Sequence, residues 1–201
     1  MTFSTADSTL KSIATFSLVT ALSSFSFSAT SATQENQASI NELKTEAISI
    51  VKQFGGTLKP KLKKALTEGG VSHAIKVCSE EAPQIAKNLS ETSSWQVKRV
   101  SLKARNNSTA KPDLWETSVL EAFNQRQKQG ESAKTMAKAE IINNEFRFMK
   151  AQGTAPLCLT CHGTKLANET KTALKNYYPD DQATGYSLGQ IRGAFSLTKQ
   201  L

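Results

Sequence analysis

Two cysteines and a histidine stand together near the C-terminus, in the segment "CLTCHG" from Cys158 to Gly163. No other segment constrains the fold as much, because the spacing C-x-x-C-H is typical of covalent haem attachment. In such motifs the two thiols form thioethers with the haem vinyl groups, and the adjacent imidazole binds the iron as proximal ligand. The motif therefore predicts one haem c, held by Cys158 and Cys161 and ligated by His162.

Other sites could use the same residues. A structural zinc site usually has four ligands in two close pairs. Here the second pair could come only from His73, Cys78 or His162, which are oddly spaced. A thioredoxin-like redox motif should follow a strand at the start of a helix, whereas this one lies close to the C-terminus and is followed directly by His162 and Gly163. A disulfide between the two motif cysteines would be short and strained. Zinc remains a lesser alternative to haem.

The first residues read as a leader. The stretch "STLKSIATFSLVTALSSFSFSATSA" has one lysine, then uncharged apolar, serine and threonine residues, and ends in small residues. This order is typical of a secretory signal peptide, and we expect cleavage after Ala32 or Ala29. The stretch is too rich in serine for a membrane span of about 20 apolar residues. The sequence predicts a signal peptide over residues 1–32, a mature domain over residues 33–201, and a periplasmic location.

The net charge of the chain limits the kinds of partner that we expect. The chain has 25 basic and 17 acidic residues, a net charge of +8, which favours anionic partners. No basic run alternates with aromatic residues, so nucleic acid is not an expected partner. We expect an acidic redox or signalling protein as partner, and no membrane span in the mature chain.

A haem iron usually takes a second axial ligand. Outside the leader and the motif, the remaining candidates are His73, Cys78, Met136 and Met149. On a helix, Cys78 shares a face with apolar neighbours, whereas His73 points about 140° away. Cys78 is therefore either a small buried hydrophobic residue or the distal ligand, and Met149 is the next choice.

The hydrophobic pattern begins with helices. We expect one helix from Ile40 to Gly55-Gly56, a second over residues 58–66 that stops at Gly69-Gly70, and a third from Val71 that is bent or restarted at Pro83. The alternating segment "WQVKRVSL" (residues 95–102) predicts a strand.

Turns and caps define the second half. Asp113 and Glu116 form a capping-box pattern at the start of a helix that runs to about Gln129. Residues 139–150 predict a hairpin turned at Asn143-Asn144. A short helix over residues 168–176 and a strand over residues 190–197 complete a single α+β domain with antiparallel strands.

The mature chain resembles a family of bacterial single-haem c-type proteins of PAS-like fold, many of them extracytoplasmic sensor modules. The resemblance rests on six segments in order: "AIKVCSEEAPQIA", "VKRVSLKARN", "PDLWETSVLEAF", "FRFMK", "CLTCHG" and "YYPDDQATGYSLGQIRGAFS". It implies a PAS-like antiparallel sheet with N-terminal helices. It also implies that Cys78, in the first segment, is the distal iron ligand.

The same segments contain four arginines: Arg99, Arg105, Arg147 and Arg192. The resemblance suggests that one or two of them bind the haem propionates, which need cationic partners. We expect this most of Arg105. The alternative for each arginine is a surface salt bridge.

The resemblance favours a haem sensor that responds to redox state or to CO or NO. A thiolate opposite an imidazole is labile on reduction, which suits a switch acting through a separate partner. The alternative is a periplasmic electron carrier, which gains from ligands that stay in place. In both cases we expect a binding protein without catalytic residues, not an enzyme.

Overall fold

The computed structural model describes residues 28–201, with side chains from Gln37 onward. Most of the predicted signal peptide therefore lies outside the described residues. Residues 38–201 form one compact unit. The fold described below is that of residues 38–201.

The first element, α1 (Ser28–Thr92), is a helical hairpin. Its two arms meet at Gly69 and Gly70, where Gly70 has φ 67° and ψ −164°, a conformation that favours glycine. An ion pair of 2.7 Å joins Lys61 of the first arm to Glu81 of the second, so the arms lie side by side. The predicted break at Gly69-Gly70 is confirmed.

The predicted helix end at Gly55-Gly56 is wrong, because α1 continues through both glycines and through Pro60. A glycine inside a helix costs only about 1 kcal/mol. On the same arm, Ile50 and Phe54 are buried against the sheet, and burying each such side chain stabilises the helix by about 2 kcal/mol. Packing outweighs the local preference of the two glycines.

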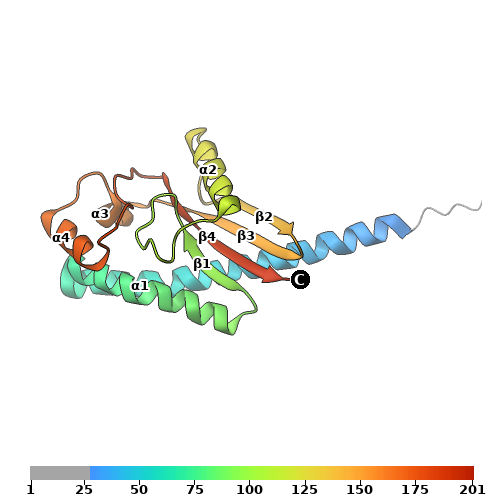
Figure 1. Cartoon of the computed structure of the whole chain (residues 1–201), viewed down its shortest axis with the longest axis horizontal. Coiled ribbons are helices and arrows are strands. Elements are labelled where there is room, and N and C mark those ends of the chain that lie inside the picture. Colours follow the sequence, from blue (N-terminus) through green and yellow to red (C-terminus); the bar gives the residue numbers. More distant parts are fainter. Residues whose placement is uncertain (1–27) are drawn as a thin grey trace, which may run out of the picture. The chain divides into compact units, whose positions relative to one another are not determined.

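Four antiparallel strands form one sheet (Figure 1). They are β1 (Gln96–Val100), β2 (Ala137–Ile142), β3 (Glu145–Gly153) and β4 (Ile191–Gln200), in the order β1-β4-β3-β2. The turn between β2 and β3 is Asn143-Asn144, with φ of 51° and 61°, as a type I′ turn requires. The predicted hairpin is confirmed.

Helices cover both faces of the sheet, with the arms of α1 on one side and α2 (Leu114–Lys128) on the other (Figure 1). Alternation along β3 divides the core. Phe146 and Phe148 pack with the α1 cluster, whereas Met149 packs with Leu120 and Phe123 of α2. This arrangement confirms an α+β domain and is consistent with the PAS-like expectation.

The predicted capping box at the start of α2 is confirmed. Asp113 accepts a hydrogen bond from the Glu116 backbone at 2.8 Å, and the Glu116 carboxylate accepts one from the Asp113 backbone at 2.9 Å. Glu116 is fully buried and also accepts from Ser196 of β4 and Lys98 of β1. It therefore fastens α2 to the sheet.

The motif lies on the excursion between β3 and β4. The chain forms a short 3₁₀ turn η1 (Pro156–Cys158), the single turn α3 (Leu159–His162) and α4 (Asn168–Tyr177), then returns to β4. The buried Ala173 and Leu174 of α4 pack on Ile75 of α1. Within residues 28–201, no helix combines the length and apolarity needed to cross a membrane.

Candidate cofactor-binding site

A cavity of about 760 Å³ lies between the α1 hairpin, the sheet and the motif segment. This volume is typical of a site for a cofactor or other organic ligand. Four of its lining residues are those predicted to hold or ligate a haem: Cys78, Cys158, Cys161 and His162. Residues 80 positions apart in the sequence thus meet at one cavity.

The motif itself forms two consecutive short turns. The backbone of Cys158 donates to Ala155 at 2.9 Å, and that of Gly163 donates to Leu159 at 2.9 Å. The thiols of Cys158 and Cys161 therefore lie one helical turn apart, and both are free. This spacing allows both sulfurs to bond to one ligand.

The His162 ring is oriented by the backbone of Ala183, 21 positions later in the sequence. Its Nδ1 lies 2.7 Å from the carbonyl oxygen of Ala183, which can only accept, so Nδ1 carries the proton and Nε2 a lone pair. Burial, aided by Arg192 and Arg105, lowers the pKa of His162 to about 2. The imidazole is thus neutral with Nε2 free of a proton, the form that binds a metal.

The segment opposite the motif is fastened to it by the main chain. Tyr186 donates to the carbonyl oxygen of His162 at 2.9 Å, and Gly185 donates to that of Gly163 at 3.0 Å. Together with the Ala183 contact, these bonds hold both the backbone and the ring of His162. The ring position is fixed by backbone that belongs to the loop before β4.

Arg105 lies directly beside the motif. Its Nη1 is 3.3 Å from His162 Nε2, and its Nη2 donates to the carbonyl oxygen of Cys161. The Asp181 carboxylate holds the guanidinium with two hydrogen bonds of 3.1 Å. Arg105, the arginine that the sequence analysis favoured, therefore lies at the site, beside His162 and Cys161.

Arg99 and Arg192 line the cavity without a carboxylate partner. In the described part of the chain neither makes an ion pair, and the buried Nε of each has no hydrogen-bond partner. Burial lowers the pKa of both, opposed for Arg99 by the Cys78 thiol and reinforced for Arg192 by Arg99. Two uncompensated guanidinium groups in one cavity fit a ligand that carries carboxylates, as haem does.

Cys78 enters the cavity from the second arm of α1. It lies on the face with Ala74, Ile75 and Ala82, which also line the cavity, while His73 is exposed. The sequence had predicted this orientation for both residues. Burial raises the pKa of the Cys78 thiol, and the nearby Arg99 opposes the shift.

Other predicted candidates lie elsewhere. Met136 and Met149 are fully buried in the cluster under α2. Arg147 pairs with Asp113 and stacks on Trp115, with its guanidinium 4.4 Å from the ring centroid, and is not among the residues that line the cavity. These three side chains connect α2 and the sheet.

Sequence reasoning missed three residues that shape the site. Tyr178 lines the cavity, with the Arg105 guanidinium 5.8 Å from its ring centroid. Asp181 and Ala183 hold Arg105 and His162. The acidic pair "DD" at residues 180–181, in a chain of net charge +8, was the available signal for Asp181. A backbone carbonyl such as that of Ala183 leaves no signal in a sequence.

Comparison with known proteins finds one family and one similar structure. The profile of the Tll0287-like family matches residues 20–199. The crystal structure of the cyanobacterial heme-protein Tll0287 superposes with a TM-score of 0.62 at 22% identity, covering 79% of this chain and 95% of that one, which shows a shared fold. No curated protein matches. Since the family profile extends over most of its length, the chain belongs to the Tll0287-like family.

Proposed function

We propose that this protein is an exported, periplasmic c-type haem protein that carries one covalently bound haem. The observation that carries the proposal is that Cys78, Cys158, Cys161 and His162 line a single cavity of about 760 Å³. The leader predicted over residues 1–32 supports export. The heme-protein named in the similar crystal structure has the same fold.

Each residue has a role in this proposal. Cys158 and Cys161 would hold the haem as thioethers, and His162 would present the unprotonated Nε2 to the iron because Ala183 holds Nδ1. Cys78 would be the second protein ligand of the iron. Arg99 and Arg192, with Arg105, would compensate the charge of the haem propionates. When bound, the haem supplies an iron that changes oxidation state and can bind a small gas.

A zinc site is less well supported. Within residues 28–201, no three histidine, cysteine or acidic side chains come together as a group that could hold a metal ion. Cys78 and His162 share the cavity without forming such a cluster. This separation suits a large organic cofactor that carries its own metal, and not a bare metal ion.

We further propose that the protein responds to redox state or to CO or NO, and that it passes the signal to a separate partner without catalysing a reaction. His162 is fixed by the backbone of Ala183 and Tyr186. Cys78 belongs instead to a helical arm that joins its neighbour at Gly70. A change at the Cys78 sulfur would act on this arm, whereas the motif side would stay in place.

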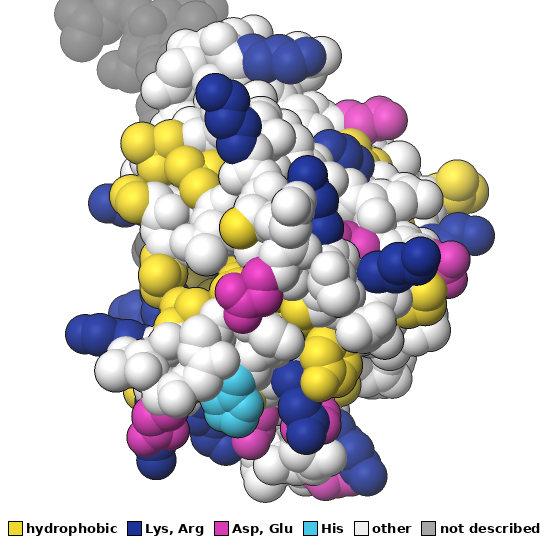
Figure 2. All heavy atoms as spheres, turned by 90° about the vertical axis from the view of Figure 1, so that its left-hand side faces the viewer, with side chains coloured by type: hydrophobic (Ala, Val, Ile, Leu, Met, Phe, Trp, Pro, Cys, Tyr) yellow, Lys and Arg dark blue, Asp and Glu magenta, His cyan; other side chains and the backbone are white. Residues whose placement is uncertain are grey.

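An electron carrier is the second candidate, since a net charge of +8 suits an acidic redox partner. On the face shown in Figure 2, however, lysine and arginine side chains are interspersed with acidic and hydrophobic ones. That face shows no broad patch of one sign among the described residues. The charge distribution there does not select the carrier over the sensor.

Optical spectra of the matured protein in both oxidation states test the choice. A sensor should lose the Cys78 ligand on reduction and bind CO or NO only when ferrous. Limited proteolysis within residues 57–90 should change at the same time. A carrier should keep the same two ligands, bind no gas, and exchange electrons rapidly with small acidic redox proteins.

A further inference from the structure

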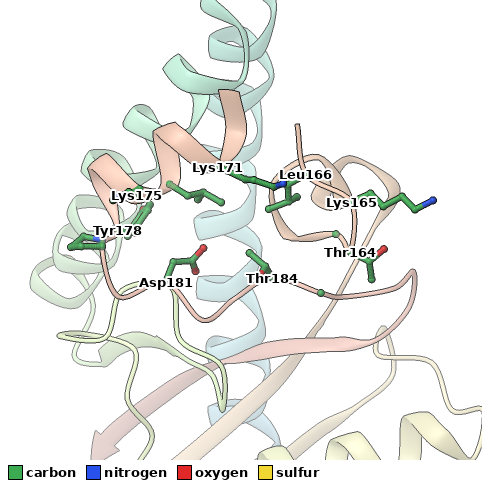
Figure 3. Close-up of a pocket in the computed structure, with 12 residues that line it drawn as sticks. Thr164, Lys165, Leu166, Lys171, Lys175, Tyr178, Asp181 and Thr184 are labelled. Carbon is green, nitrogen blue, oxygen red and sulfur yellow. The ribbon is translucent and has the colours of Figure 1, made fainter. Parts of the chain in front are cut away.

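A second depression lies beside the motif, with a volume of about 630 Å³. Its walls are α4, the segment 163–166 that follows His162, and the loop 178–185 (Figure 3). The volume is many times the roughly 30 Å³ of a water molecule. The depression therefore has room for an organic ligand.

Three lysines line this depression: Lys165, Lys171 and Lys175. All three are exposed, and within the described residues none makes an ion pair. Lys171 and Lys175 are four residues apart on α4, where two like charges weaken a helix. An anion between them would relieve this repulsion.

The remaining polar groups agree with an anionic ligand. Thr164 and Thr184 contribute hydroxyl groups to the lining, and hydroxyls can donate hydrogen bonds. The acidic group in the lining, Asp181, is already neutralised by Arg105 at 3.1 Å. In Figure 3, Lys171 reaches from α4 toward Leu166, whereas Lys165 extends outward, with rotamers that allow it to turn back.

The depression and the cofactor cavity are separate but share a wall. Tyr178 lines both of them. The loop 178–185 contributes Asp181 and Thr184 to the depression and Ala183 to the cavity. Ala183 is also the residue whose carbonyl oxygen holds His162 Nδ1 at 2.7 Å. A ligand in the depression would thus touch the loop that orients His162.

We propose that this depression binds a small polyanion, with at least two negative charges on phosphate or carboxylate groups, between Lys165, Lys171 and Lys175. The binding itself does not depend on haem. A second effect rests on the proposed function: the bound anion lowers the midpoint potential of the haem, because nearby negative charge favours ferric iron.

Calorimetric titration of the purified full chain with pyrophosphate and, separately, with citrate tests the binding. We expect saturable one-to-one binding that weakens as salt is added. The double variant Lys171→Gln/Lys175→Gln should bind about tenfold more weakly. Tighter binding of pyrophosphate would assign a phosphate ligand, and tighter binding of citrate a carboxylate ligand.

The matched control is Lys111→Gln/Lys128→Gln, which removes the same charge from two exposed lysines that line neither the depression nor the cavity. Its affinity should equal that of the wild type. Equal weakening in both double variants would show attraction by net charge alone and overturn the site. The absence of saturable binding by both anions would overturn it as well.

A measurement on the wild-type chain avoids any effect of substitution on folding. Lysine acetylation followed by mass spectrometry should show that pyrophosphate or citrate protects Lys171 and Lys175 but not Lys111. Equal modification at all three positions contradicts the proposal. Because both binding tests can be done whether or not the chain carries haem, a missing haem spectrum would refute the proposed function and leave the anion site standing.

Discussion

The carboxylate of Asp181 clamps the guanidinium of Arg105, with Nε–Oδ1 and Nη2–Oδ2 distances of 3.1 Å each. Both side chains are nearly buried, at 14% and 7% exposure. The same carboxylate accepts a hydrogen bond from the Ala183 backbone at 2.8 Å, and Ala183 holds His162. One acidic residue thus positions both the cation and the histidine of the site.

Asp181→Asn should therefore destabilise the fold and disturb the site together. Removing one partner of a buried ion pair costs about 3 kcal/mol, measured as a loss in the free energy of unfolding by urea. The midpoint potential of the haem should also shift, because Arg105 and His162 lose their orientation. Glu68→Gln, which breaks the exposed Lys64–Glu68 pair of 3.8 Å, is the control and should cost less than about 1 kcal/mol. Equal losses would contradict the positioning role.

Cys78→Ala should leave haem attached and change its ligation. In the proposed haem protein the thioethers would be formed by Cys158 and Cys161 and not by Cys78, so covalent haem content should stay the same. The ferric spectrum should lose its low-spin form, and the potential should rise because a thiolate favours ferric iron. The control is His73→Ala, five residues earlier on the same arm and exposed. The reverse pattern would transfer the distal ligand to His73.

Arg99→Gln and Arg192→Gln should each lower the midpoint potential, since both residues place a positive charge at the cavity. Loss of a nearby cation favours the more positive, ferric iron. Redox titration of the matured variants measures the shift. Arg126→Gln removes an arginine that is paired with Glu131 away from the cavity, and its potential should equal that of the wild type. A potential unchanged in both cavity variants would remove these arginines from the haem site.

Local signals in the sequence predicted much of the fold. The capping box at Asp113 and Glu116 and the turn at Asn143-Asn144 are set by neighbouring residues, and both form as expected. The helix through Gly55-Gly56 could not be predicted in this way. Its stability comes from Phe54, which packs on Phe195 of β4 with ring centroids 5.1 Å apart, a contact across 141 positions.

In the site, too, local sequence patterns predicted some features and tertiary structure determined the others. The motif could be predicted because haem attachment requires particular residue types at a particular spacing. The orientation of Cys78 could be predicted because helical geometry determines which face of the helix a side chain lies on. The sequence could not show which arginine faces the cavity, since Arg99 and Arg147 both lie in strands with alternating side chains. Only the tertiary structure places Arg99 at the cavity and Arg147 beside Asp113.

Acid should weaken the attachment of α2 through Asp113. Burial alone raises the pKa of Asp113, but hydrogen bonds from the Glu116 backbone and Arg147 outweigh it, so the pKa lies below its ordinary value of 3.8. The stabilisation is complete above the ordinary pKa and is lost as pH falls through the lower, folded value. Because Asp113 is 46% exposed, the effect should be under about 1 kcal/mol.

Urea unfolding between pH 7 and pH 2 measures this effect. Asp113→Asn keeps a side-chain oxygen for the helix cap and should lose less stability on acidification than the wild type. Asp180→Asn removes an exposed carboxylate that has no ion pair within the described residues, and should follow the wild-type curve. Parallel curves for Asp113→Asn and the wild type would contradict the assignment.

Acid-acetone extraction of the mature protein, purified from a host with cytochrome c maturation, tests whether the chain binds haem covalently. We expect haem to stay on the chain through extraction and through a denaturing gel, because covalent bonds to Cys158 and Cys161 would hold it. Cys158→Ala/Cys161→Ala should abolish this retained haem. A wild-type protein that contains zinc and no haem, or that loses all its haem to the solvent, would contradict covalent haem attachment.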